Sequence, residues 1–173
     1  LILFAGFNMQ TSQNSTNFVA EKPDVLIINN DKEQKLSKNL VFLNRLDTDK
    51  EIVITVDSTI KECRCPQCGK LSNSVQAKYI KKFQDLPIDG KTVYIKINNR
   101  VFNCINNECD LDMFSEQYDF VDFKKNKTKR LFKHILDVSS TTSNRKAEKI
   151  LKDEGIVVGK SAIALLLAEN KSN

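Results

Sequence analysis

Much of the middle of the chain alternates between apolar and polar residues, which is the period of a β-strand with one buried face. This pattern predicts three strands, over residues 79–88, 93–97 and 100–102. The Asp89-Gly90 dipeptide suits a hairpin turn between the first two strands, and Asn98-Asn99 is expected to turn the chain into the third. Turns of this kind join neighbouring antiparallel strands, so a small meander is expected.

A strand, a helix and a second strand are expected before this meander. The apolar run at 24–29 is consistent with a short strand. Asp31, with Gln34 three residues later, resembles a capping box and predicts a helix. The apolar face of that helix would carry Leu36, Leu40 and Leu43. Strand-like alternation then follows at Ile52, Ile54 and Val56.

The apolar period becomes helical after residue 128. Thr128 is expected to cap a first helix, Thr142 or Ser143 a second that ends at Gly155, and a third begins after Gly159. Their apolar faces are Leu131, Phe132, Ile135 and Leu136, then Ala147, Ile150 and Leu151, then Ile163, Leu166 and Leu167. This order is typical of a helix-turn-helix, although three-helix units that only pack against a partner share it.

Two pairs of cysteines flank the predicted meander with the spacing of a metal site. The four residues are Cys65, Cys68, Cys104 and Cys109. Gly69 follows the first pair and can adopt the positive φ of a zinc knuckle. Four thiolates complete a tetrahedral zinc ion and leave no position for water, which indicates a structural rather than a catalytic metal. His134 is the single histidine, so a Cys2His2 finger is excluded.

Other interpretations of these cysteines are disulfides, which need an oxidising compartment, and ordinary buried thiols. The fifth cysteine, Cys63, lies two residues before Cys65, which is the wrong spacing for a knuckle partner, so we interpret it as a spectator or a weak competing ligand. A sheet as small as the predicted one buries little apolar surface. A metal ion would therefore supply folding energy that the sheet lacks.

Positive charge is concentrated in one part of the chain. The net charge is +5, and residues 120–152 contain ten basic and three acidic side chains. Such a cluster is often only a solvated surface, but its coincidence with predicted helices favours a polyanionic partner. No stretch of apolar residues is long enough to cross a membrane.

Several of these motifs, in this order, resemble the N-terminal region of insertion-sequence transposases of the ISL-three family. The resemblance covers about residues 45–170 and implies a four-cysteine zinc finger before a helix-turn-helix. It places zinc on the same four cysteines that the spacing selects. The motifs are Cys65-Pro-Gln-Cys68-Gly, Tyr79, Asp85-Leu-Pro-Ile with Gly90, Arg100-Val-Phe102-Asn-Cys104, Cys109, Phe114-Ser-Glu116, Thr128 and the segment 147–167.

The resemblance implies an N-terminal DNA-binding fragment of a bacterial, cytoplasmic transposase. Its expected partner is double-stranded DNA at the terminal inverted repeats of an insertion sequence, and a homo-oligomer is compatible with this role. Base contacts are expected from Lys160 and Ser161, although the rest of that helix is apolar. Phosphate contacts are expected from Lys124, Lys125, Lys127, Lys129, Arg130, Arg145 and Lys146.

Catalysis is not expected from this chain. In the family, a DDE nuclease domain follows the helix-turn-helix, and the chain stops at Asn173, where that domain would begin. Two alternatives stay open. One is a stand-alone zinc-finger and helix-turn-helix transcriptional regulator. The other is a protein-interaction module that docks a partner through its apolar third helix.

These patterns predict an α+β protein with a small zinc-bound antiparallel β module followed by a three-helix helix-turn-helix module. The expected divisions are a disordered or partial N-terminal tail at 1–30, a lead-in helix and strand at 31–62, a four-cysteine zinc-finger module at 63–119, and a helix-turn-helix DNA-binding module at 124–170.

Overall fold

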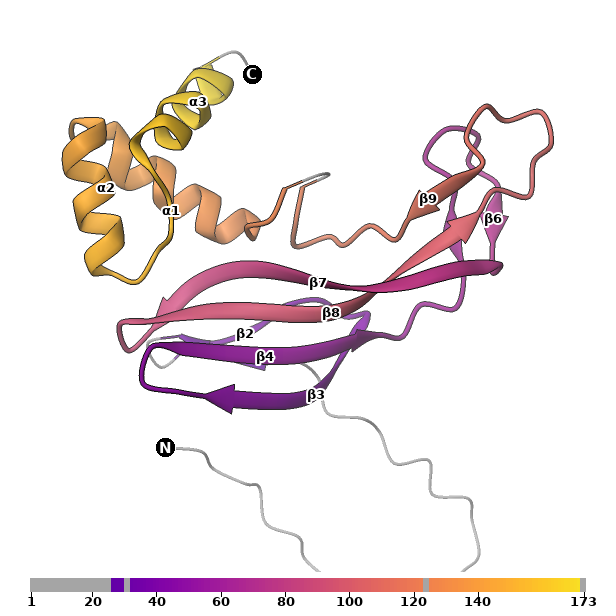
Figure 1. Cartoon of the computed structure of the whole chain (residues 1–173), viewed down its shortest axis with the longest axis horizontal. Coiled ribbons are helices and arrows are strands. Elements are labelled where there is room, and N and C mark those ends of the chain that lie inside the picture. The colour runs from indigo at the N-terminus through magenta and orange to yellow at the C-terminus, as the bar shows by residue number, and fades with distance from the viewer. Residues whose placement is uncertain (1–25, 30–31, 123–124, 172–173) are drawn as a thin grey trace, which may run out of the picture.

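The protein combines a five-stranded sheet with three helices, which confirms the predicted α+β class. The computed structural model describes residues 26–29, 32–122 and 125–171. The helices lie near one end of the sheet, and the cysteine-bearing loops near the other (Figure 1). The elements are β1 (Leu26–Asn29), β2 (Lys32–Lys35), β3 (Leu40–Asp47), β4 (Glu51–Ser58), β5 (Cys63–Arg64), β6 (Leu71–Ser72), β7 (Val75–Ile88), β8 (Lys91–Asn103), β9 (Met113–Ser115), α1 (Lys129–Ser140), α2 (Asn144–Asp153) and α3 (Lys160–Lys171).

A long hairpin of β7 and β8 forms the axis of the molecule. The predicted turn at Asp89-Gly90 is confirmed, because both residues have positive φ, at 52° and 72°, as a two-residue type I′ turn requires. The second predicted turn is wrong. Asn98 and Asn99 lie inside β8 and pair with Ile80 and Tyr79 of β7, so ladder hydrogen bonding overrides their local preference for a turn.

The strand pairs within residues 63–119 are antiparallel, as predicted, but the whole sheet is mixed because the lead-in strand β4 joins it in parallel. Its strand order is β3-β4-β8-β7, and β9 also pairs with β8. The chain passes from β4 through the first cysteine pair and along β7 before it returns as β8. As a result β4 and β8 run parallel, with Ile52 beside Val93 and Ile54 beside Ile95. The predicted lead-in strand is therefore part of the same sheet as the strands between the cysteines.

The core of this sheet follows from the predicted alternation. The inward-facing side chains of β4 and β8 are almost completely buried, and Phe83 of β7 joins them. Phe120 and Val121, from the segment after β9, also belong to this core. Its central members are Ile52, Ile54, Val56, Phe83, Val93, Ile95 and Ile97.

The predicted helix at 31–43 is wrong, because this region contains β2 and β3. Leu40 and Val41 are buried in the pair that β3 forms with β4, whereas Leu43 is half exposed. A register shift between Phe42 and Asn44 interrupts the period of two. Leu43 is the extra residue at this shift, so Leu40 and Leu43 do not share a helix face. In the tail predicted at 1–30, residues 26–29 form β1, and residues 1–25 and 30 lie outside the described residues.

The three helices occur where the sequence predicts them. The Thr128 side chain accepts a hydrogen bond from the backbone N–H of Leu131 and caps α1, as expected. Ser143 is the N-cap residue of α2, and Gly155, with φ of 86°, follows that helix. Within the described part of the chain, no helix is both long and apolar enough to cross a membrane. The helices pack through Leu131, Ile135, Ala147, Leu151, Ile156 and Ile163, all fully or almost fully buried.

Polar contacts join the helices to the hairpin. The backbone of Gln84 in β7 bonds to both Asn126 and Thr128, which lead into α1. On the other side, the carbonyl oxygen of Gly155 accepts hydrogen bonds from Thr92 Oγ1 at 2.7 Å and from Gln84 Nε2 at 3.3 Å. These contacts fix the connection between α2 and α3 against the Asp89-Gly90 end of the hairpin.

Candidate metal centre and nucleic-acid interface

The four predicted cysteine ligands lie together. All four sulfur atoms fall within 4.8 Å of one another, although the two pairs are about 40 residues apart in sequence. The sulfurs of Cys65 and Cys109 are 3.9 Å apart, and those of Cys68 and Cys104 are 3.6 Å apart. A tetrahedral ion with Zn–S bonds of about 2.3 Å needs sulfurs about 3.8 Å apart. The geometry therefore fits zinc, and all five cysteines are free thiols rather than disulfides.

Two tight turns hold the first pair of cysteines. Cys65 follows β5 directly, and its N–H and C=O bond to the carbonyl oxygen of Lys70 and the N–H of Gly69, each at 2.9 Å. Gly69 has φ of 74°, the left-handed conformation predicted for it, and open space surrounds its Cα. The pairing of β5 with β6 closes this knuckle.

The end of the long hairpin supplies the second pair. Cys104 follows β8 without a break, as predicted, and its N–H donates to the carbonyl oxygen of Asp112 at 2.7 Å. Cys109 N–H donates to the carbonyl oxygen of Asn106 at 3.0 Å, which closes the intervening loop. Beneath the sulfurs, the rings of Phe102 and Phe114 stack at 5.9 Å and form a small separate core.

Backbone N–H groups point at three of the sulfurs. Lys70, Asn106 and Leu111 donate to Cys68, Cys104 and Cys109, in each case from two residues further along the chain. Such hydrogen bonds stabilise thiolates and orient them for a metal.

Without a metal, the four thiols compete for negative charge. The hydrogen bond from Lys70 lowers the pKa of Cys68 to about 7. A similar bond from Asn106 lowers the pKa of Cys104, but desolvation and the neighbouring thiols outweigh it and raise the pKa to about 12. One thiolate therefore suppresses ionisation of its neighbours. A cation at the centre reverses this effect, because zinc displaces the remaining protons.

Cys63 lies outside the cluster. It is half-buried in β5, opposite Ser72, and it is not among the residues that can share the ion. Burial raises the pKa of its thiol, which makes it a poorer ligand. The structure thus separates the spectator cysteine from the four ligands, as the spacing predicted.

The metal-binding end of the molecule is not positively charged. Residues 61–74 and 104–113 together carry three basic and four acidic side chains. A zinc ion with four thiolates adds a further net negative charge. The excess of positive charge of the chain therefore lies elsewhere on the protein.

Several of the basic residues predicted for DNA are engaged with acidic residues of the protein. The guanidinium group of Arg130 bonds to the buried carboxylate of Asp85 through two nitrogen atoms. Lys129 Nζ lies 3.5 Å from the Asp122 carboxylate and is otherwise exposed. The structure thus gives Arg130 an internal partner and leaves Lys129 largely accessible.

Three further predicted phosphate contacts lie just before α1. Lys125 Nζ is 3.0 Å from Glu169 of α3. Lys127 is half-buried, and desolvation lowers the pKa of its ammonium group. Lys124 lies outside the described residues.

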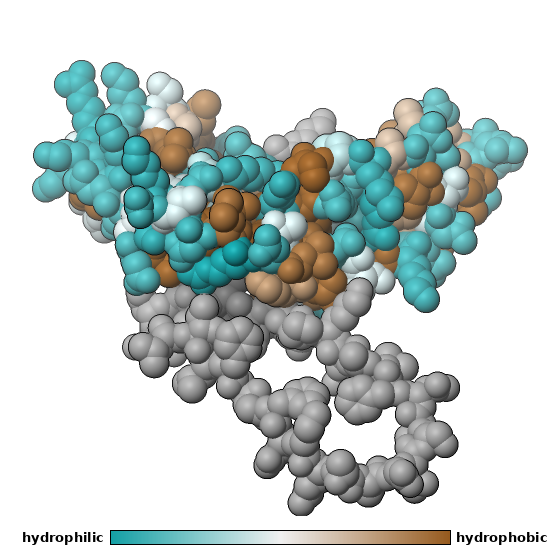
Figure 2. Space-filling model, turned by 60° about the horizontal axis from the view of Figure 1, so that its bottom comes forward, coloured by the Kyte–Doolittle hydropathy of each residue, from teal (hydrophilic) through white to brown (hydrophobic). Residues whose placement is uncertain are grey.

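The other predicted residues are exposed on the helices. Arg145 and Lys146 lie in the first turn of α2, and Lys160 and Ser161 begin α3. Sequence reasoning missed Lys133, Lys149 and Lys152, which are also exposed. Helical periodicity gives the missing signal, because Arg145, Lys149 and Lys152 are spaced i, i+4, i+7 and share one side of α2. The lobe of the helices is mostly hydrophilic, whereas hydrophobic side chains reach the surface over the sheet (Figure 2).

The third helix combines a basic start with an apolar body. Leu165 is 66% exposed, and Val157, just before the helix, is 62% exposed. With Phe132 of α1 they border an open apolar groove, and Lys125 and Glu169 also line it. The predicted core contacts of α3 are confirmed for Ile163, Leu166 and Leu167.

Comparison with protein families finds a match to the cysteine-bearing part of the chain. Residues 61–109 match the zinc-finger of transposase IS204/IS1001/IS1096/IS1165. The matched segment begins just before the first cysteine pair and ends at Cys109, so it contains all four ligands. Together with the sulfur geometry, this match identifies the cluster as a zinc site. Neither the curated proteins nor the solved structures contain a match to the chain.

Proposed function

We propose that this chain is the DNA-binding part of a transposase and that it recognises the terminal inverted repeats of an insertion sequence. The match of residues 61–109 to a transposase zinc finger is the observation that carries this proposal. The matched family model is itself described as the zinc-finger of a transposase. A transposase must find the ends of its own element before it can act, so the terminal inverted repeats are the proposed target.

The proposed DNA contacts lie on the helices. Residues 128–171 contain nine basic and five acidic side chains, in contrast to the zinc end of the molecule. Basic side chains facing a duplex release counterions from its phosphates, which is the main source of sequence-independent affinity. The exposed candidates are Lys129, Lys133, Arg145, Lys146, Lys149, Lys152 and Lys160.

We further propose that α2 and α3 act as a helix-turn-helix, with α3 directed at the major groove. The two helices pack on each other and on α1 through Ala147, Leu151 and Ile163. Residues 154–159 connect them, a longer link than the usual turn of three or four residues. Lys160 and Ser161, at the start of α3, supply the polar groups for base edges. The zinc site is structural in this proposal, because four thiolates leave no open coordination position.

Salt titration of DNA binding tests the proposal. The zinc-loaded protein is titrated against a labelled duplex containing an element end and against a scrambled duplex, at several salt concentrations. Each lost phosphate contact should reduce the slope of log affinity against log salt by about 0.9. The triple variant Arg145→Ala, Lys146→Ala, Lys149→Ala should flatten the slope accordingly.

The matched control removes a lysine from the zinc end of the molecule, away from the helices. Lys61→Ala eliminates one positive charge at an exposed position just before β5. Its slope should equal that of the parent protein. Equal affinity for the end-containing and scrambled duplexes would contradict recognition of inverted repeats, and undetectable binding to either duplex would contradict DNA binding altogether. In the presence of magnesium, the protein should bind the end-containing duplex without cleaving its strands.

A further inference from the structure

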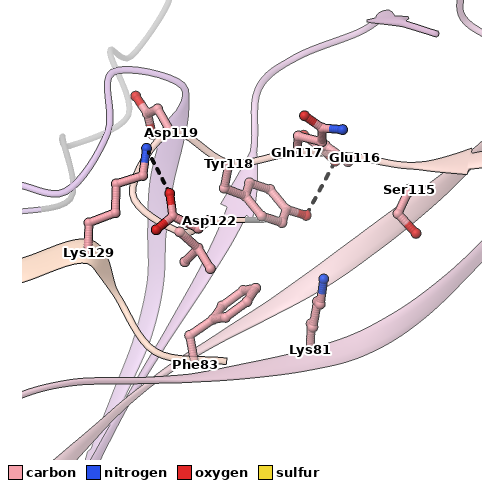
Figure 3. Close-up of a pocket in the computed structure, with 10 residues that line it drawn as sticks. Lys81, Phe83, Ser115, Glu116, Gln117, Tyr118, Asp119, Asp122 and Lys129 are labelled. Atoms are coloured by element: carbon pink, nitrogen blue, oxygen red, sulfur yellow. Dashed lines mark hydrogen bonds and ion pairs between the residues drawn. The ribbon is translucent and has the colours of Figure 1, made fainter. Parts of the chain in front are cut away.

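A polar cavity lies between β7 and the segment that runs from β9 to α1. Lys81 and Phe83 of β7 form one wall, Ser115 and Tyr118 the other, and Lys129 at the start of α1 closes one end. The Lys81 side chain points toward the space between Tyr118 and Ser115 (Figure 3). Lys81 and Lys129 are far apart in sequence, and the docking of α1 beside β7 brings them to one cavity.

Two adjacent lysines of β7 have different surroundings. Lys82 lies on one face of the strand, where its Nζ is 3.8 Å from the centre of the Tyr94 ring and 3.8 Å from the Glu51 carboxylate. Lys81 lies on the opposite face, because side chains alternate along a strand. Its Nζ is 5.3 Å from the centre of the Phe83 ring, and within the described residues no carboxylate is within ion-pair distance. The ammonium group of Lys81 therefore faces the cavity and can interact with a ligand there.

The acidic residues around the cavity have partners of their own. Glu116 is buried and bonds to both Arg100 and Ser58. Asp119 accepts a hydrogen bond from Ser37 at 3.2 Å, and Asp122 pairs with Lys129. Ser115 lines the cavity, and its hydroxyl group lies 3.4 Å from that of Tyr79, so both hydroxyl groups are suited to donate to an anion at this side.

We propose that this cavity binds a phosphate of the DNA backbone, and that DNA which meets the helices continues past α1 to the edge of β7. This inference rests on the proposed function. An ammonium group with no carboxylate partner in the described part of the chain, a second lysine and two hydroxyl groups are side chains of the kind that contact DNA phosphates. Lys129 connects the cavity to the basic helices, so a single duplex reaches both.

The test compares two variants at adjacent positions. Lys81→Ala and Lys82→Ala remove the same charge from the same strand, but only Lys81 faces the cavity. We expect Lys81→Ala to reduce the salt slope of duplex binding by about 0.9 and to weaken affinity several-fold at low salt. Lys82→Ala should keep the parent slope. Lys81→Arg, which keeps the charge, should restore the slope.

The possible outcomes separate this inference from the proposed function. If Lys81→Ala keeps the salt slope of the parent protein while the triple variant of α2 has a flattened slope, phosphate binding in the cavity is overturned. DNA binding by the helices would then remain supported. Equal losses in Lys81→Ala and Lys82→Ala would show a general charge effect and also overturn phosphate binding in the cavity. Absence of DNA binding by the parent would overturn both. Thermal unfolding of each variant verifies that the fold is retained, and Lys81→Gln replaces Lys81→Ala if the latter unfolds.

Discussion

Arg130 donates a hydrogen bond of 2.7 Å from Nε to Oδ1 of Asp85, and this carboxylate is completely buried. The same carboxylate oxygen accepts a bond of 2.6 Å from the hydroxyl group of Thr128, the residue that caps α1. From a position near the end of β7, Asp85 therefore bonds both to the residue that caps α1 and to a cation of the first turn of that helix. The sheet and the helices are joined by this carboxylate.

Replacement of Asp85 by Ala should strongly destabilise the protein. The change removes the buried carboxylate to which the guanidinium group of Arg130 bonds, and breaking a buried pair typically costs about 3–5 kcal/mol. Chemical denaturation should show this as a lower midpoint. Asp137→Ala, at an exposed position of α1, serves as the control and should change the midpoint little. Equal midpoints for the two variants would show that Asp85 does not couple the modules.

Gly155 should tolerate substitution less well than Gly90. Both residues have positive φ, which costs a residue with a side chain about 1–2 kcal/mol. At Gly155 an added Cβ would also lie 2.9 Å from the carbonyl oxygen of Gly90, whereas at Gly90 it would meet open space. Gly155→Ala should therefore lower the free energy of unfolding more than Gly90→Ala does. If both variants lose the same amount, the close contact between the two turns is not maintained in solution.

Purified protein should contain one zinc ion per chain, measurable by elemental analysis. Cys104→Ser removes one of four ligands and should release the metal, and a strong chelator should have the same effect on the parent protein. Loss of zinc should destabilise the cysteine-bearing end, because few apolar residues besides Phe102 and Phe114 hold it together. Cys63→Ser provides the matched control and should retain the full zinc content. Zinc retained by Cys104→Ser and lost by Cys63→Ser would contradict this ligand assignment.

Metal-free protein should react with iodoacetamide first at Cys68. The hydrogen bond from Lys70 lowers the pKa of this thiol to about 7, so its reactive thiolate accumulates as pH rises through neutrality. The pKa of Cys104 is raised to about 12, so Cys104 should stay unreactive over the same range. Mass spectrometry of peptides after timed labelling between about pH 6 and pH 8 measures both rates. Zinc should protect both thiols, and faster labelling of Cys104 than of Cys68 would contradict the assigned hydrogen bond.

The parts that the sequence predicted best are those that local chemistry controls. Asp89-Gly90 forms a two-residue turn because both positions accept positive φ. Thr128 caps α1 because its hydroxyl group reaches a free backbone N–H three residues later. The zinc ligands were predicted from spacing alone, because a thiolate cluster needs particular residue types at short intervals.

Errors arose where a neighbouring strand changed the meaning of a local pattern. Asn98-Asn99 is a good turn sequence, yet β7 pairs with it throughout and keeps the strand straight. The leucines at 40 and 43 suggested a helix, but Leu40 pairs with Ser58 in β4 and Leu43 is the extra residue at a register shift of the same strand pair. The parallel pairing of β4 with β8 had no sequence signal, because alternation along a strand does not reveal its neighbours.

The amino-acid sequence by itself determined the four cysteines, the hairpin turn, the helical segments and their excess of positive charge, because each depends on residues close together in the chain. The tertiary structure decided which basic side chains remain free. It paired Arg130 with Asp85 and Lys82 with Glu51, and it placed Lys81 and Lys129 at one cavity. The physical reason is that charge is a property of a residue, whereas the availability of that charge depends on the groups that folding brings within a few ångströms of it.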